Sequence, residues 1–209
     1  MRFVQLVLFV MVVLLAGCAG FNLDAPKGVV DNTFYSSKFP RIMVEVEETL
    51  HYQQKENNRE LALGSNLRRS THVEQDLYAF VSEDKKSVLV IRVERLRELN
   101  WYMNTPDYSQ QPNCYASGTE SLAGVRFSTG ISAVRKKNHT LLLKSYGAVF
   151  GDAILLQIFY AEEVADSWAQ TTSLQSKEKA AELEAFNQRA GRSFTVGDYR
   201  EPAALAASN

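Results

Sequence analysis

The sequence predicts an α+β domain: an antiparallel sheet of about five to seven strands with a C-terminal amphipathic helix packed on one face. Two observations carry this prediction. Between residues 41 and 160, segments of strand-forming residues alternate with short polar or glycine-containing connections. From residue 173 onward, the apolar residues instead recur at helical spacing. A small β-barrel with an external helix is the alternative, because such strands can also close into a barrel.

The first strand is expected within residues 41–47, where branched apolar residues alternate with other side chains and therefore share one face. Residues 51–53 either extend this strand or begin its neighbour. In the polar stretch 55–60, the pair Asn57-Asn58 suits a turn.

The middle of the chain is expected to form two antiparallel meanders. Residues 73–81 and 87–96 are joined by a polar connection of hairpin length, so we expect them to be neighbours. Residues 87–96 begin with apolar side chains on both faces, which is typical of a central strand. The second meander consists of residues 122–134, 139–146 and 153–160.

The helix is expected to begin at Ser173 or Ser176, either of which can cap it, and Gly191 suits the left-handed residue after its end. Its apolar stripe consists of Ala180, Leu183, Phe186 and Ala190. Residues 201–209 are rich in alanine and unpatterned, so we expect a disordered tail there.

The N-terminus has the organisation of an export signal. Met1-Arg2 supplies one positive charge, residues 3–16 are mostly apolar, and the chain continues Leu15-Ala16-Gly17-Cys18. This tetrapeptide resembles the lipobox of bacterial lipoproteins at every position. The resemblance implies that residues 1–17 are a signal peptide and that Cys18 becomes the lipid-modified mature N-terminus. An uncleaved signal anchor is the alternative.

The same resemblance implies a location in the cell envelope. Two or more acyl chains on Cys18 would anchor the protein stably to a membrane. In lipoproteins of bacteria with two membranes, an Asp at the next position favours the inner membrane, and this chain has Ala19. We therefore expect the outer membrane, facing the periplasm. Residues 18–33 would be the lipidated N-terminus and tether, and residues 34–200 a single α+β domain.

Charge and cysteine content narrow the class of protein. The chain has 23 basic and 24 acidic residues, and one Arg lies in the signal segment, so the mature chain has a formal charge of −2. This balance lacks the basic excess of nucleic-acid-binding domains, and no nucleic-acid partner is expected. With Cys18 lipidated, Cys114 is the remaining cysteine, and we expect it to be buried and inert.

The sequence contains no paired constellation of catalytic or metal-binding residues. His51, His72 and His139 lie singly on different segments, unlike metal ligands with paired spacing. A hydrolase that uses Cys114 with His139 is an alternative, but the chain has no elbow such as G-x-S-x-G. We therefore expect no enzymatic activity, no metal and no cofactor.

One segment, residues 100–118, is long for a connection and holds several aromatic residues among amide and hydroxyl side chains. The candidate binding residues in it are Trp101, Tyr102, Tyr108 and Tyr115. Exposed aromatic side chains of this kind stack on sugars or anchor a protein partner. The alternative is that they fold back onto the sheet and seal its edge.

Together these features predict a membrane-anchored, non-catalytic envelope lipoprotein that binds another envelope component, either a protein or a glycan. The alternative is a carrier or sensor of a small ligand, which requires a cavity between sheet and helix or inside a barrel. The Cys114-dependent hydrolase remains a third alternative.

Overall fold

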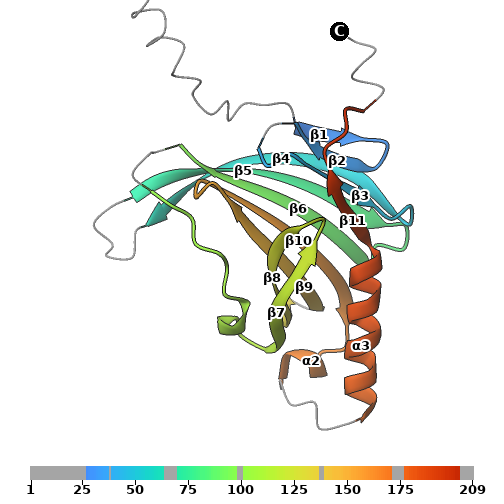
Figure 1. Cartoon of the computed structure of the whole chain (residues 1–209). Helices are drawn as coiled ribbons and strands as arrows, with labels where there is room; N and C mark the ends of the chain where they lie inside the picture. The colour runs from blue at the N-terminus through green and yellow to red at the C-terminus, as the bar shows by residue number, and fades with distance from the viewer. Residues whose placement is uncertain are drawn as a thin grey trace, which may run out of the picture.

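The computed structural model describes residues 27–37, 39–63, 70–97, 101–136, 139–170 and 177–202. Within these ranges the chain forms two antiparallel sheets and a C-terminal helix (Figure 1). The predicted antiparallel sheet is confirmed and the C-terminal helix is present, but the described residues are largely β, the helix is short, and the second sheet was not predicted. The large sheet has different strands, β4 and β7, at its two ends. It is therefore open, and the β-barrel alternative is wrong.

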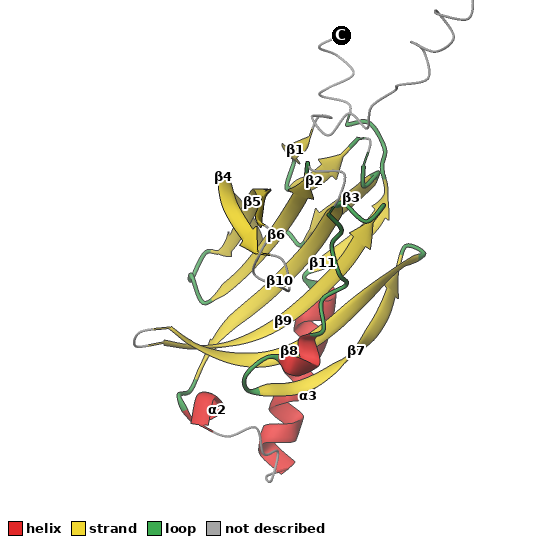
Figure 2. Cartoon of the chain, turned by 90° about the vertical axis from the view of Figure 1, so that its left-hand side faces the viewer, coloured by secondary structure: helices red, strands yellow, loops and turns green. Residues whose placement is uncertain are grey.

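The large sheet has seven strands in the order β4-β5-β6-β10-β9-β8-β7 (Figure 2). Their bounds are Leu50–Leu63 for β4, Ser70–Ser82 for β5, Ser87–Leu96 for β6, Cys114–Leu122 for β7, Val125–Lys136 for β8, His139–Phe150 for β9 and Ile154–Val164 for β10. Strand β6 has the predicted bounds and lies within the sheet, as its two apolar faces indicate. The predicted pairing of residues 73–81 with 87–96 is also confirmed.

The small sheet has the order β1-β2-β3-β11. Its strands are β1 Lys27–Val30, β2 Thr33–Ser36, β3 Ile42–Val46 and β11 Phe194–Asp198. Only β3 was predicted. Strand β1 lies inside the expected tether 18–33, so that expectation is wrong from Lys27 onward. Strands β1 and β11 each contain a glycine, which is depleted in strands, and they lack the run of alternating branched residues that marks β3.

One face of the large sheet, here called the inner face, packs against the small sheet. The rings of Phe34 on β2 and Tyr78 on β5 lie 4.8 Å apart between centroids, and those of Tyr146 on β9 and Phe194 on β11 lie 5.1 Å apart. These aromatic side chains are buried and fill the space between the two sheets. The opposite face is called the outer face.

Helix α3, Lys177–Arg192, also lies against the inner face (Figure 1). Phe186 is buried against Tyr160 of β10, with ring centroids 5.8 Å apart. Arg189 forms two hydrogen bonds with the Glu162 carboxylate at 2.7 and 2.8 Å. Burial would raise the pKa of Glu162, but hydrogen bonds from Arg189 and Tyr160 outweigh it and lower the pKa.

The predicted helix needs two corrections, and its predicted start is not among the described residues. Leu183, Phe186 and Ala190 are buried as predicted, but Ala180 is exposed. Gly191 lies inside α3 instead of ending it. The predicted caps Ser173 and Ser176, and most of the predicted tail 201–209, fall outside the described residues. No helix in the described part of the chain is long and apolar enough to cross a membrane.

The polar stretch 55–60 is part of strand β4, so the turn predicted at Asn57-Asn58 is wrong. Strand β4 forms one edge of the large sheet, and residues 51–57 have exposed side chains. An edge strand whose side chains face solvent needs no apolar alternation, so it resembles a polar turn in sequence.

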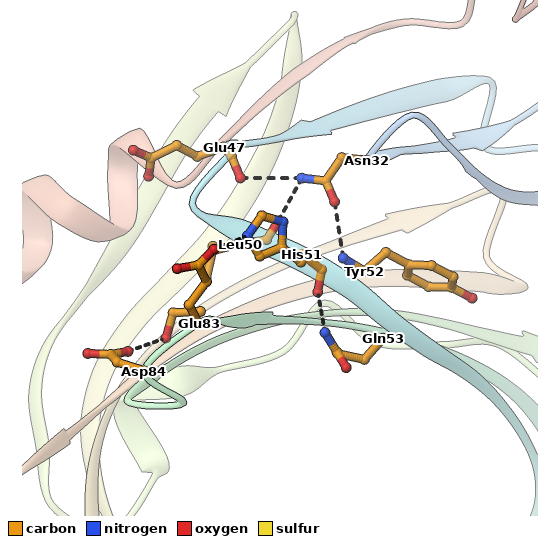
Figure 3. A network of polar contacts seen from close by, with 9 residues as sticks. Asn32, Glu47, Leu50, His51, Tyr52, Gln53, Glu83 and Asp84 are labelled. Carbon is orange, nitrogen blue, oxygen red and sulfur yellow. Dashed lines mark hydrogen bonds and ion pairs between the residues drawn. The ribbon is translucent and has the colours of Figure 1, made fainter.

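Asn32, in the turn between β1 and β2, connects the small sheet to the start of β4 (Figure 3). It has a positive φ of 60°, and its side-chain Nδ2 donates to the carbonyl oxygens of Val46, Glu47 and Leu50 at 2.7–3.3 Å. Its Oδ1 accepts a 3.1 Å hydrogen bond from the backbone N–H of Tyr52. One side chain therefore links the carbonyls at the β3–β4 corner.

Candidate functional site

The four aromatic residues predicted to form one binding loop do not come together. Tyr102 is 71 % exposed, Trp101 is half-buried, and Tyr108 is only 4 % exposed. Tyr115 is the second residue of the edge strand β7, which begins at Cys114, so it lies outside the connection that precedes this strand. Of the four, Tyr102 alone has the exposure expected of a stacking residue.

Tyr108 is buried because it lies over two glycines of the outer face. A Cβ atom added to Gly130 would lie 2.4 Å from the Tyr108 Cβ, and one on Gly147 would lie 2.7 Å from its hydroxyl. The Tyr108 hydroxyl accepts a 2.9 Å hydrogen bond from Gln157 Nε2, and Arg92 Nε donates to Gln157 Oε1 at 2.9 Å. For Tyr108, the alternative of folding back onto the sheet is the observed one.

Tyr115 packs on the short helix α2, Ser167–Gln170. Its ring centroid lies 5.1 Å from that of Trp168, and its hydroxyl donates to the Trp168 carbonyl. Lys179 Nζ lies 4.7 Å from the Trp168 ring centroid and 5.4 Å from that of Tyr115. Tyr115 therefore joins β7 to the two helices. Cys18, the predicted lipidation site, lies outside the described residues.

The structure does not bring Cys114 and His139 together. Cys114 is half-buried and its thiol donates to the carbonyl of Ala116 at 3.3 Å. His139 Nδ1 lies 2.6 Å from Glu163 Oε1 of β10, three strands away from β7 in the sheet. In the part of the chain that is described, no group of three His, Cys, Asp or Glu residues is arranged to hold a metal ion.

The site that the structure does assemble is a cleft between strand β7 and helix α3, here called the β7 cleft. It has a volume of about 260 Å³. It is lined by Ala116–Glu120 of β7, Thr129–Ile131 of β8, Lys144 of β9 and Asn187 of α3. Three strands and a helix from distant parts of the sequence therefore form its walls.

Lys144 forms the polar end of the β7 cleft. It is only 4 % exposed, although lysine is among the residues least often buried. Its Nζ donates to Glu120 Oε1 at 2.7 Å and to Asn187 Oδ1 at 2.6 Å. It also lies 4.8 Å from the ring centroid of Tyr146. The ammonium group is thus fully surrounded, and it fixes β7, β9 and α3 relative to one another.

Glu120 differs from Lys144 in its exposure, because 40 % of its side chain faces solvent. The carboxylate belongs both to the buried ion pair and to the rim of the cleft. Tyr146 lies beside this pair, and its pKa is raised by burial and by the negative charge of Glu120.

On the β7 side of the cleft, residues 116–119 have small side chains. Gly118 faces the cleft, and a Cβ added to it would meet only Thr129 Oγ1, at 4.0 Å. Ala116, Ser117, Gly118 and Thr119 are all exposed. Within the described residues, β7 pairs with β8 alone, so its other edge is open (Figure 2). The cleft can therefore accept a bulky group, and the strand beside it can accept backbone hydrogen bonds.

A second hollow lies at the β3–β4 corner and is lined by Glu48, Thr49, His51, Ser82, Glu83 and Asp84; Figure 3 labels His51, Glu83 and Asp84 among them. His51 Nε2 lies 3.6 Å from Glu83 Oε1, and both side chains are largely exposed. Asp84 accepts hydrogen bonds from Ser82 and the Lys86 backbone, which lower its pKa. These are solvated charges on a turn, and they form no enclosed site.

Sequence reasoning missed the β7 cleft. Residues 116–118 lack branched apolar residues, so the sequence pattern places them in the aromatic loop 100–118 instead of in a strand. One signal was present: Lys144 interrupts the apolar run of residues 141–149, and a lone lysine in a buried strand needs a partner. The sequence does not show that this partner is Glu120.

Comparison with known proteins identifies no relative. No family model matches the chain, and no curated protein and no solved structure shows significant similarity to it.

Proposed function

We propose that this chain is a membrane-anchored, non-catalytic lipoprotein of the cell envelope that binds another envelope component at the β7 cleft. The observation that carries the binding proposal is the open edge of β7 beside a cleft whose β7 wall consists of small residues. Soluble proteins usually protect such edges by charges, prolines or covering elements. An exposed edge of small residues next to a hollow suits a surface that is covered by a partner.

The anchor proposal rests on the sequence Leu15-Ala16-Gly17-Cys18. Eight residues, 19–26, lie between Cys18 and Lys27, where strand β1 begins, and the nine Cα–Cα steps span at most about 32 Å when fully extended. Strand β1 and helix α2 lie at opposite ends of the molecule (Figure 1). A lipid on Cys18 would therefore keep the β1 end near the membrane and leave the α2 end farther out.

Intact mass spectrometry of the protein from its native membrane tests the anchor. We expect a mass equal to residues 18–209 plus acyl chains, and its loss in Cys18→Ser. A full-length mass without lipid would contradict the lipoprotein proposal. It would instead support the uncleaved signal anchor.

Photo-crosslinking in intact cells tests the binding surface. A benzophenone amino acid is placed at Ser117 on the open edge of β7 or, as the matched control, at Gln54 on the exposed edge strand β4. We expect a discrete adduct from the Ser117 position that is missing from the Gln54 position. Equal adducts from both positions, or none from Ser117, would refute the β7 cleft as the binding surface.

A further inference from the structure

We infer that the partner presents an extended segment, which adds to β7 as an eighth strand of the large sheet and places an aromatic side chain over Gly118. This inference rests on the proposed function and specifies how the β7 cleft is used. It is argued from three features: the direction of the free backbone groups, the lack of protection on this edge and the space above Gly118.

The hairpin between β7 and β8 determines which backbone groups of β7 are free. Ala123 and Gly124 have φ values of 48° and 76°, as in a two-residue type I′ turn, and Leu122 pairs with Val125 across it. In such a hairpin the residues flanking the turn form a hydrogen-bonded pair, and these pairs alternate along the ladder. The even-numbered residues from 122 back to 116 therefore bond to β8.

The N–H and C=O groups of the odd-numbered residues Ser117, Thr119 and Ser121 then point away from the sheet. The side chains of all three are exposed. The bulge in the β7–β8 pairing lies between Cys114 and Ala116, so the ladder is regular beyond it. An incoming strand thus meets three residues with correctly spaced donors and acceptors.

The other edge of the large sheet is protected, and this one is not. Strand β4 carries exposed charged side chains on both faces, Lys55, which is paired with Asp76, and Glu56, and it has a bulge between Tyr52 and Gln54, whereas the β7 bulge lies before residue 116. Both features discourage pairing with another chain. From residue 116 to 122, β7 carries one charge, that of Glu120, and it is paired with Lys144. The contrast between the two edges singles out β7 for strand addition.

Gly118 determines what the incoming strand carries. Side chains at positions directly opposite in neighbouring strands lie about 5 Å apart, so a residue opposite Gly118 meets no side chain there. Its own side chain instead reaches Thr129 and Ile131 on the floor of the cleft. An aromatic side chain across from an edge glycine covers the exposed backbone and fills this space. The cleft volume of about 260 Å³ accommodates one such group.

A second copy of this chain fits the edge less well. Antiparallel pairing of β7 with itself places Gly118 opposite Gly118 or Glu120 of the other copy in the registers centred on the exposed residues. Residues 116–120 offer only Ala, Ser, Gly, Thr and Glu, so no aromatic group would enter the cleft.

Binding of a synthetic peptide to the full-length protein in detergent tests the inference. The probe is a fluorescein-labelled nonapeptide, Lys-Thr-Val-Thr-Trp-Thr-Val-Thr-Lys, and its control has Ala in place of Trp. We expect saturable binding of the Trp probe, at least about tenfold tighter than that of the Ala probe. Absence of saturable binding of the Trp probe would overturn the inference.

Two substitutions at Thr119 separate backbone pairing from side-chain effects. Thr119→Pro removes an outward N–H without removing a bond to β8, and Thr119→Val keeps that N–H with a similar shape. We expect the Trp probe to bind at least about fivefold more weakly to Thr119→Pro and within about twofold of wild type to Thr119→Val. Equal binding by the two variants would overturn strand addition.

Gly118→Trp supplies a second variant if Thr119→Pro fails to fold. It leaves the outward backbone groups intact and fills the cleft, so the preference for the Trp probe over the Ala probe should fall to within about twofold. A preserved preference would contradict an aromatic group over Gly118. Sedimentation of the protein without peptide reports the other occupant: a dimer lost in Thr119→Pro would show that β7 pairs with a second copy.

Failure of this inference differs from failure of the proposed function. If the Ser117 crosslink persists in a Thr119→Pro background, a partner occupies the β7 cleft without adding a strand, and only the inference is wrong. If Ser117 gives no crosslink in the wild-type background, the proposed binding surface itself is wrong.

Discussion

Replacing Gly130 by Ala tests whether Tyr108 can pack on the outer face only because position 130 has no side chain. The new Cβ would lie 2.4 Å from the Cβ of Tyr108, about 1 Å closer than ordinary contact allows. Gly118→Ala is the matched control, because it lies on the partner strand of the same hairpin and its nearest neighbour would be 4.0 Å away. The two substitutions add the same methyl group to β-strand glycines.

The expected change in the free energy of unfolding follows from the burial that Tyr108 would lose. A buried tyrosine removes about 200 Å² from water, worth up to about 5 kcal/mol at about 25 cal/mol per Å². If the segment shifts without releasing Tyr108, overpacking costs about 1–3 kcal/mol. We therefore expect Gly130→Ala to lower the free energy of unfolding by about 3 kcal/mol. Gly118→Ala should be neutral or stabilising by up to about 1 kcal/mol.

Guanidinium unfolding followed by tryptophan fluorescence measures both variants, and limited proteolysis within residues 101–113 reports release of the segment. Faster cleavage should accompany Gly130→Ala only. Free energies of unfolding that agree within about 0.5 kcal/mol between the two variants would refute this prediction, since they would mean that Tyr108 can move away from residue 130 without loss of stability.

Three further predictions concern polar contacts. Because hydrogen bonds hold the pKa of Glu162 below its ordinary value, its ionised form stabilises the fold above about pH 4.5, and this contribution is lost as the pH falls through the folded-state pKa. Thermal melts at pH 7 should therefore show a lower melting temperature for Glu162→Gln than for wild type, and the two melting temperatures should converge as the pH is lowered to 3. A difference in melting temperature that stays constant from pH 7 to pH 3 would contradict this. Asn32→Gly should cost about 2 kcal/mol in chemical denaturation through lost hydrogen bonds, and Asn32→Ala about 1 kcal/mol more, because only glycine adopts a positive φ without strain. Glu120→Ala should lower the free energy of unfolding by about 3 kcal/mol, since it leaves the buried ammonium of Lys144 without its carboxylate. Lys144→Met should cost less than about 1 kcal/mol, because the Glu120 carboxylate can turn to solvent. The reverse order of the two costs in urea unfolding would be inconsistent with the exposures of the two groups.

The central strands were predictable from the sequence because the local pattern of apolar residues indicates which of their side chains are buried. In β6, apolar residues on both faces indicated an interior strand with the correct ends. The edge strands β4 and β7 were not recognised, because exposed side chains remove the alternation that marks a strand. Polar residues of β4 therefore suggested a turn, and small residues of β7 suggested a loop.

The candidate site was less predictable than the fold, because it depends on contacts between distant residues. The burial of Tyr108 requires Gly130 and Gly147, which the sheet register brings beneath it. The β7 cleft likewise requires that Lys144 and Asn187 lie beside residues 116–120. No periodicity within a single segment encodes such proximity, although the lone lysine in β9 marked one of its members.

The pairing of β3 with β11 has a consequence for folding kinetics. On the side away from β2, Ile42–Val46 pairs with Phe194–Asp198, about 150 residues later, so the small sheet cannot be completed until residue 198 is available. Closing so long a loop carries a large entropic cost before any contact compensates for it, and non-local strand pairing slows folding. A chain shortened before residue 194 would leave β3 with an unpaired edge and Tyr146 without the Phe194 ring. The last strand of the described chain is thus the one that completes the small sheet.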